Sequence, residues 1–572
     1  MPLSRISSRP LTALALVLST LAPAALQADG SAGAYLATRS ADMHGDFSAV
    51  VEFGTRALAR DPSNVEIMQG LLVAQIGLGD IDTGVPVARR LIQLDPGNQI
   101  AGLVLLSGAM QAENWALVIE TLEGGVSVGG LMDQMILAWA HMGAGRMSQS
   151  LTLLDELAED PGSRAFALYH KAMALALVGD FETAAEILAN EEGALQRNQR
   201  GVMGYAQILS QLDRQDEAIA LIDRMFPGFI HEDLVALRAQ LEQGGAVPFT
   251  SLTRPGDGIA RVFFTVADTL AAEADPQIVL LYSRVAEYLD PELYEATILS
   301  AQLLEVMERY ELAVTTYGRI SPDFYAYPEA ALGRADALRR LERVEEAIGE
   351  LNALAKAYPD LAPVQVALGD TLRFEDRFEE AVAAYDAAIA LYGSEPPNHR
   401  WGVFFARAIS HERLKQWPQA EADFRKALEL NPGQASVLNY LGYSFVEKRI
   451  NLDEALDMIE QAVAAEPRSG YIVDSLGWVY FRLGRYEEAV EQMERAVELM
   501  PVDPVVNDHL GDTYWAVGRK REAEFQWSRA LSFITEDSDL EEIKPDRIRR
   551  KLEVGLDVVL EEEGADPLHA SE

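Results

Sequence analysis

The stretch from Tyr471 to Pro501, YIVDSLGWVYFRLGRYEEAVEQMERAVELMP, decides the fold, because it holds two helical patterns in succession. In its first half, apolar and small residues recur every three or four positions, which places them on one face of a helix. Gly484 is expected to end this helix, and a second run with the same period ends at Pro501. The stretch therefore predicts two antiparallel helices joined by a tight turn.

Small residues mark the predicted contact between these helices. Helix axes approach to about 8–10 Å, and the closest approaches require small side chains at the contact. We expect Gly477 and Ala489 to lie where the two helices meet, and Ala496 where the next pair packs. Tyr480 is expected to be buried beside these contacts.

The same pattern recurs along the chain at intervals of 34 or 35 residues, as from Gly442 to Gly477 and from Gly477 to Gly511. One helix pair cannot bury its apolar face alone, so stacked pairs share a continuous core. The residues assigned to packing within and between pairs are Gly369, Ala381, Ala420, Ala427, Gly442, Ala455, Gly477, Tyr480, Ala489, Ala496, Gly511, Tyr514 and Ala523.

These residues resemble the tetratricopeptide repeat, a helix-turn-helix unit of about 34 residues. The resemblance is strong from about Tyr294 to Leu531, moderate from Arg164 to Asp223 and weak elsewhere. The segment 439–478 also resembles a bacterial envelope subgroup of the family. The resemblance implies an all-α, right-handed superhelical solenoid of stacked antiparallel helix pairs, with a concave inner surface and a C-terminal capping helix.

Breaks in the periodic pattern predict where the parts of the chain begin and end. The predicted parts are a signal peptide at 1–28, degenerate repeats at 29–241, a Gly- and Pro-rich linker at 242–258, a regular repeat array at 259–537, a capping helix at 538–562 and a disordered tail at 563–572.

The first 28 residues have the layout of a secretory signal peptide. Arg5 and Arg9 precede an apolar run of about sixteen residues, and a small residue, Ala28, lies at the end. The run is shorter than the roughly 20 residues needed to span a bilayer, and Pro23 interrupts it. We therefore expect cleavage and a periplasmic protein with no membrane span. The alternatives are secretion to the medium and a retained N-terminal anchor.

The charge balance constrains the partners. The chain has 48 basic and 89 acidic side chains, a formal net charge of −41. This field repels phosphate backbones and anionic membrane surfaces, and attracts basic partners. Nucleic acid is therefore excluded as a partner. The chain contains no cysteine, so it has no disulfide, thiolate metal site or N-terminal lipid-modified cysteine.

One motif is typical of a hydrolase: residues 125–129 have the pattern G-x-S-x-G, with Ser127 in the nucleophile position. Its flanks predict helices rather than the strand that precedes such a serine in an esterase, which favours an inter-helix loop. The histidines are scattered, and His411 and His509 fall on predicted repeat helices, where packing or surface roles are expected. No catalytic residue, cofactor or metal is predicted.

In the resembled family, the first helix of each pair lines the concave groove. The register predicts that aromatic residues, carboxylates and one amide line it here: Phe405, Asn439, Tyr443, Asp474, Trp478, Phe481, Asp508, Asp512 and Trp515. Such a groove suits an extended or helical peptide with apolar and basic side chains. The alternative is that the aromatic residues only pack between repeats.

These patterns predict a non-enzymatic periplasmic scaffold or adaptor that binds protein partners through the concave face, in cell-envelope assembly. Two other functions stay open at this point: a serine hydrolase that uses Ser127, and a structural repeat protein that associates with itself.

Overall fold

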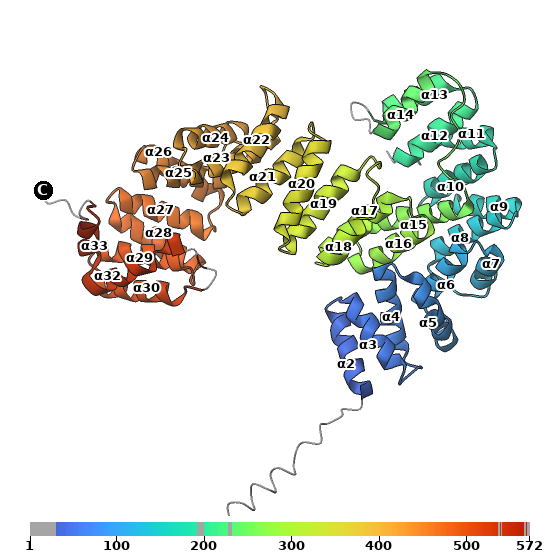
Figure 1. The fold of residues 1–572 in the computed structure, drawn as a ribbon, viewed down its shortest axis with the longest axis horizontal. Helices are drawn as coiled ribbons and strands as arrows, with labels where there is room; N and C mark the ends of the chain where they lie inside the picture. The colour runs from blue at the N-terminus through green and yellow to red at the C-terminus, as the bar shows by residue number, and fades with distance from the viewer. Residues whose placement is uncertain are drawn as a thin grey trace, which may run out of the picture. The chain divides into compact units, whose positions relative to one another are not determined.

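The computed structural model describes residues 30–191, 199–226, 232–535, 538, 540–565 and 568. These residues form helices and connecting turns with no strand, and consecutive helices pack as antiparallel pairs, so the predicted all-α solenoid is confirmed (Figure 1). The predicted signal peptide and most of the predicted tail lie outside the described residues. The chain divides into two compact units, 1–350 and 351–572.

The helices of the first unit are α2 (Gly30–Met43), α3 (Phe47–Leu58), α4 (Val65–Leu78), α5 (Ile81–Leu94), α6 (Gln99–Gln111), α7 (Trp115–Glu123), α8 (Gly130–Gly143), α9 (Met147–Leu157), α10 (Arg164–Leu177), α11 (Phe181–Asn190), α12 (Gln199–Gln211), α13 (Gln215–Met225), α14 (Glu232–Glu242), α15 (Pro255–Leu270), α16 (Pro276–Leu289), α17 (Tyr294–Val306), α18 (Tyr310–Tyr317) and α19 (Tyr327–Arg340). Helix α20 (Val344–Ala357) crosses the division between the units.

The second unit contains α21 (Ala362–Phe374), α22 (Phe378–Tyr392), the short 3-10 helix η2 (Asn398–Arg400), α23 (Trp401–Arg413), α24 (Trp417–Leu430), α25 (Ala435–Lys448), α26 (Leu452–Ala465), α27 (Gly470–Arg482), α28 (Tyr486–Leu499), α29 (Pro504–Ala516), α30 (Lys520–Ser532), α31 (Leu540–Ile543), α32 (Pro545–Val554) and α33 (Leu556–Glu562).

The first unit folds back on itself. Helix α15 packs against α8 and α10, and α16 packs against α4 and α6, which are the first helices of earlier pairs (Figure 1). Arg284 Nε donates to the Gly77 carbonyl at 3.2 Å, and the Tyr288 hydroxyl lies 2.5 Å from Asp82 Oδ1. The face that was expected to line an open groove is therefore covered by two later helices of the same unit.

The predicted linker at 242–258 lies within the first unit, where residues 245–253 form an extended strap along α12. Gln207 Oε1 accepts from the backbone N–H groups of Thr250 and Ser251, each at 3.1 Å. Ser210 Oγ accepts from the Val247 N–H at 2.8 Å. The last residues of the predicted linker belong instead to the first turn of α15, which begins at Pro255.

Glycines in the repeats make room for one large side chain of the partner helix. A Cβ at Gly369 would lie 2.6 Å from Tyr385, one at Gly477 2.8 Å from Met493, and one at Gly511 2.5 Å from Trp527 Nε1. In each case the large residue follows the glycine by sixteen positions. The side chain that Gly477 admits is therefore Met493. The packing alanines are fully buried: Ala381, Ala420, Ala427, Ala455, Ala489, Ala496 and Ala523.

Two packing tyrosines differ in burial. Tyr514 is 7% exposed, as expected. Tyr480 is only half-buried: its hydroxyl donates to Glu460 at 3.0 Å, and Arg485 lies over its ring at 4.4 Å. Tyr480 is therefore less buried than expected, because its hydroxyl edge contacts charged side chains while the ring packs on the core.

The C-terminal cap consists of three helices, although one helix was expected over 538–562. Lys544 between α31 and α32 and Gly555 between α32 and α33 both have positive φ, of 52° and 86°. Left-handed residues of this kind end helices. Helix α32 packs against α30, and α31 packs against α29. The cap therefore covers the last helix pair of the array.

Candidate partner-binding groove

Two adjoining cavities, of about 460 and 850 Å³, lie along the first helices α25, α27 and α29 of the second unit. Successive first helices lie beside one another, since α25 packs on α27 and α27 packs on α29. The cavities share five lining residues: Tyr440, Tyr443, Val505, His509 and Ile543. We call the surface formed by both cavities the C-terminal groove.

Six of the nine residues predicted to face a groove line these cavities. Asn439 and Asp474 line the smaller cavity, Tyr443 lines both, and the larger one adds Trp478, Asp508 and Asp512. The indole N–H of Trp478 donates to Glu447 at 2.9 Å, and its ring stacks on His509 at 4.1 Å. Trp478 is consequently 9% exposed and forms part of the groove wall rather than a projecting side chain.

The other three predicted residues pack elsewhere. Phe405 lies among aromatic rings, 6.0 Å from Phe424 and 5.9 Å from Tyr440. Phe481 stacks on Trp478 at 4.8 Å. Trp515 is covered by the cap, since its indole N–H donates to Asp557 of α33 at 2.9 Å.

The aspartates of the groove are paired with cations of the same chain. Asp474 Oδ2 lies 2.9 Å from His509 Nδ1. Burial alone would lower the pKa of His509, but the carboxylates of Asp474, Asp508 and Asp512 outweigh it and raise that pKa to about 9. His509 is therefore protonated at neutral pH and neutralises one carboxylate of the groove.

The cap supplies the cations for the other two aspartates. Lys551 Nζ, which is buried, lies 2.5 Å from Asp508 Oδ1 and 2.6 Å from Asp512 Oδ1. Arg547 adds a contact of 3.4 Å to Asp512 Oδ2. The three groove aspartates thus stabilise the repeat stack and the cap, and little of their charge remains to attract a basic ligand.

Sequence reasoning missed several groove residues. Tyr471 lines the smaller cavity and is 63% exposed, and Arg482 lines the larger one, where burial and the nearby Arg449 lower its pKa. Val505 and Tyr440 line both cavities. Tyr471 has a sequence signal, because it lies at the start of a first helix and off that helix's packing face.

Ser127 is part of a loop that caps α8. Its hydroxyl donates to Asp133 Oδ2 at 2.5 Å, and the neighbouring Val128 N–H donates to Asp133 Oδ1 at 2.8 Å. In a Ser-His-Asp triad the nucleophile hydroxyl contacts an imidazole base, whereas within the described residues the side-chain partner of Ser127 is this carboxylate. His411, the other histidine singled out, contacts Gln416 Oε1 through Nδ1 at 2.8 Å. In the described part of the chain, no group of three or more His, Asp or Glu side chains is placed to hold a metal ion.

Family models of the tetratricopeptide repeat match residues 165–190, 298–362, 362–394, 401–434 and 473–501. A TPR repeat-containing protein of Pseudomonas aeruginosa is 30% identical over 83 residues, 14% of this chain and 14% of that protein. The lipoprotein NlpI homolog of Haemophilus influenzae is 31% identical over 99 residues, 17% of this chain and 31% of that protein. The matched part is therefore less than a third of the length of either relative.

Two solved structures are similar to the chain at low identity. The APC/C hetero-tetramer Cut9–Hcn1 has a chain that is 13% identical, with 96% of this chain and 99% of that chain covered and a TM-score of 0.37. A tetratricopeptide repeat protein from Parabacteroides merdae is 16% identical, with 46% and 98% covered and a TM-score of 0.36.

Within the described residues, no helix is both long and apolar enough to cross a membrane. The matched repeats fall on the helix pairs α10–α11, α17–α22, α23–α24 and α27–α28. Repeats of this kind are suited to protein–protein interaction. The repeat models and the stacked helix pairs together show that the chain contains tetratricopeptide repeats over the matched residues.

Proposed function

We propose that the protein is a non-enzymatic scaffold that binds a protein partner in the C-terminal groove. The observation that carries the proposal is the position of Tyr471, a large aromatic side chain that is 63% exposed at the edge of a cavity. Aromatic side chains of this kind are enriched among the residues that dominate binding energy at protein interfaces. Asn439 Oδ1, in the same cavity, is a buried oxygen without a hydrogen-bond partner in the described structure, and it can accept from a peptide N–H.

The proposed partner is a peptide segment with apolar side chains. Tyr440, Tyr443 and Val505 line both cavities and offer it apolar surface. Basic residues in the partner are favoured by the net charge of −41 and not by the groove aspartates, which are already paired. Because the attraction is then long-range, salt should slow association more than it speeds dissociation.

We place the protein in the periplasm, in cell-envelope assembly. Support comes from the signal-peptide pattern of residues 1–28 and from the Haemophilus relative, whose name describes a lipoprotein. This chain has no cysteine to carry a lipid, so it would be held there by its partner or remain free. Fractionation of a bacterium that makes the protein, with N-terminal sequencing of the mature chain, tests this part of the proposal.

Site-specific photo-crosslinking tests the groove directly. A photoreactive phenylalanine analogue replaces Tyr471 in one variant and Phe525 in the other. Phe525 is a matched control, because it is 62% exposed on α30 of the same unit and lines neither groove cavity. We expect a discrete crosslinked protein from position 471, and none from position 525, after irradiation of intact cells.

Three outcomes would count against the groove. Equal crosslinking at both positions would indicate a non-specific surface. No crosslink at 471 would remove the groove as the binding site. A crosslink from 471 to a second copy of this chain would replace the adaptor with a self-associating protein, and light scattering of the purified chain would then show an oligomer.

A further inference from the structure

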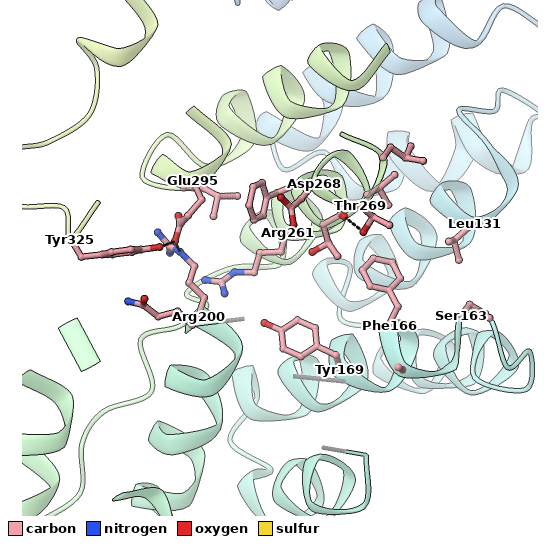
Figure 2. A pocket seen from close by; sticks show the side chains of 18 residues that line it. Leu131, Ser163, Phe166, Tyr169, Arg200, Arg261, Asp268, Thr269, Glu295 and Tyr325 are labelled. Atoms are coloured by element: carbon pink, nitrogen blue, oxygen red, sulfur yellow. Dashed lines mark hydrogen bonds and ion pairs between the residues drawn. The ribbon is translucent and has the colours of Figure 1, made fainter. Parts of the chain in front are cut away.

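A separate cavity of about 620 Å³ lies in the first unit, among helices α8, α10, α12, α15 and α17 (Figure 2). This volume is in the range of small-molecule sites. Much of its wall is apolar, with Leu131, Phe166 and Phe264 among the lining residues. The cavity exists because α15 covers the first helices of the earlier pairs, and it has no part in the function proposed above.

Arg261 of α15 brings to this cavity a guanidinium that no carboxylate contacts directly within the described residues. Its side chain is 6% exposed, and Nη2 donates to the Ser251 carbonyl of the strap. Within the described structure, its Nε and Nη1 atoms are buried without a hydrogen-bond partner. A buried guanidinium that lacks an anion is costly, so this arrangement leaves a strong donor unused.

The nearest acidic residue on the same helix does not neutralise Arg261. Asp257 lies one helical turn earlier, but its Oδ2 accepts from the N–H and hydroxyl of Thr253, at 2.9 and 2.8 Å. Its Oδ1 lies 3.0 Å from Arg254 Nε. The carboxylate of Asp257 is therefore used to hold the start of α15. Asp290 lines an adjoining cavity with Arg261 and interacts with it electrostatically, but no hydrogen bond joins the two side chains, so Nε and Nη1 of Arg261 keep their unused donors within the described structure.

Two further donors face the same cavity. Tyr169 of α10 is 7% exposed, and within the described residues its hydroxyl makes no hydrogen bond. Gln199, at the start of α12, is 9% exposed, and its Nε2 is buried without a partner. Figure 2 shows the Arg261 and Tyr169 side chains extending toward one another from α15 and α10. Several unused donors around one cavity form a preorganised anion site.

The other cation of the cavity is already neutralised. Arg200 Nε lies 2.6 Å from Glu295 Oε1, and the Tyr325 hydroxyl lies 3.4 Å from the same oxygen. This pair, visible beside the cavity in Figure 2, supplies no net charge. Arg261 is therefore the group that would select an anion.

Asp268 limits the ligand to a single negative charge. It lines the same cavity two helical turns beyond Arg261, about 10 Å along the axis of α15, and burial raises its pKa. A second anionic group on the ligand would meet this carboxylate. The aromatic rings of Phe166 and Phe264 line the same cavity and offer an apolar surface to the rest of the ligand.

We propose that this cavity binds a small monocarboxylic acid with an apolar body. The carboxylate accepts hydrogen bonds from Arg261, Tyr169 and Gln199, and the apolar body contacts Phe166 and Phe264. The same carboxylate chemistry is also found at the end of a peptide chain. The limited volume, about 620 Å³, favours the free acid, and the experiment below separates the two sources.

Calorimetric titration of the purified full chain tests the site with 4-phenylbutyrate and octanoate as probes. The neutral amide 4-phenylbutyramide controls for apolar binding alone, and the dianion 1,4-phenylenediacetate tests the role of Asp268. We expect one site for at least one of the two acids, with the amide and the dianion binding at least about tenfold more weakly than 4-phenylbutyrate. Acetyl-Ala-Ala-Phe with a free carboxylate represents a peptide end and is expected to bind more weakly than both acids.

Two variants and a matched control complete the test. Arg261→Met should weaken binding of the acid at least about tenfold, and Tyr169→Phe, which preserves the packing of the ring, by roughly two- to tenfold. Arg319→Met removes an arginine of the same unit that does not line the cavity, and should leave affinity unchanged.

Three results would overturn the proposal: no binding of either acid, equal binding of acid and amide, or unchanged affinity in Tyr169→Phe and Arg261→Met. If Arg261→Met does not fold, Tyr169→Phe alone decides. Tighter binding of the peptide than of the acids would reassign the site to a peptide end.

Discussion

His509 and Asp474 join two successive repeats, with the imidazole Nδ1 2.9 Å from Asp474 Oδ2. The ring of Trp478 stacks on the same imidazole at 4.1 Å. The cap repeats this arrangement one unit later, since Asp508 occupies the position 34 residues after Asp474 and receives Lys551. A carboxylate on a first helix thus pairs with a cation on the next repeat in one case and on the cap in the other. The same type of ion pair therefore stabilises the contact between two repeats and the contact between the last repeat and the cap.

Because of this pair, the second unit should become less stable as the pH becomes alkaline. Folding raises the pKa of His509 from 6.5 to about 9, so the contribution is complete below pH 6.5 and is lost as the pH rises through 9. At 1.36 kcal/mol per pKa unit, we expect a loss of up to about 3 kcal/mol by pH 10. Urea unfolding of the second unit, followed by tryptophan fluorescence from pH 6 to 10, measures it. Asp474→Asn should flatten this dependence, and an unchanged slope in that variant would contradict the assignment.

His170 in the first unit should behave in the opposite way. It is fully buried, and its Nδ1 accepts from the indole N–H of Trp139 at 3.2 Å. Burial, assisted by Arg261, lowers the pKa of His170 to about 3, so folding requires the neutral imidazole. The stability is present above pH 6.5 and is lost as the pH falls toward 3. Between pH 7 and pH 4.5, the free energy of unfolding should fall by about 2 kcal/mol less in His170→Gln than in the wild type. Unfolding curves of the two proteins under the same conditions measure this difference. Parallel curves for the two proteins would refute this.

The glycine that faces Trp527 should tolerate no side chain. Gly511→Ala would place a Cβ 2.5 Å from Trp527 Nε1 and should destabilise the unit by about 1–3 kcal/mol. Gly349→Ala is the control, because Gly349 is exposed within α20 and has open space around it. That substitution should stabilise by roughly 0.5–1 kcal/mol through helix propensity. Thermal unfolding distinguishes the two, and shifts of the same sign would contradict the packing account.

Removing the buried cation of the cap should strongly destabilise the cap. Lys551→Met leaves Asp508 and Asp512 buried beside one another without Lys551, and loss of one partner from a buried ion cluster costs about 3–5 kcal/mol. We expect faster hydrogen exchange in α29, α30 and α32 at neutral pH. The triple variant Lys551→Met, Asp508→Asn, Asp512→Asn should recover part of the loss. If the single variant exchanged like wild type, the cap would not depend on this cluster.

The strap should detach when its main anchor is removed. Gln207 binds Thr250 and Ser251 through both ends of its amide, with Nε2 donating to Thr250 Oγ1 at 3.0 Å. Gln207→Ala should therefore accelerate hydrogen exchange at 245–253 and lower stability by about 1–3 kcal/mol. Gln215→Ala, which loses one contact of 3.3 Å to the Gly245 carbonyl, is the milder control. Equal exchange in the two variants would show that the strap is held by other contacts.

Local patterns predicted the helices and their pairing well. The glycines on the first helices, such as Gly477, and the buried alanines from Ala381 to Ala523 recur along the regular repeats. Each of these packing contacts involves residues of a single helix pair. Tyr443 and Trp478, which the first-helix register assigned to a groove, line the cavities. The same register misplaced Trp515, because the cap that covers this ring lies outside the periodic pattern.

The sequence by itself determined that this protein is a stack of helix pairs, since helical period and small-residue spacing are local properties that each repeat restates. Tertiary structure alone decided which surfaces stay open. The return of α15 and α16 onto earlier helices, the strap on Gln207 and the unpaired Arg261 all depend on residues tens to hundreds of positions apart. Such contacts follow from how successive pairs curve and meet, and no local periodicity encodes that geometry.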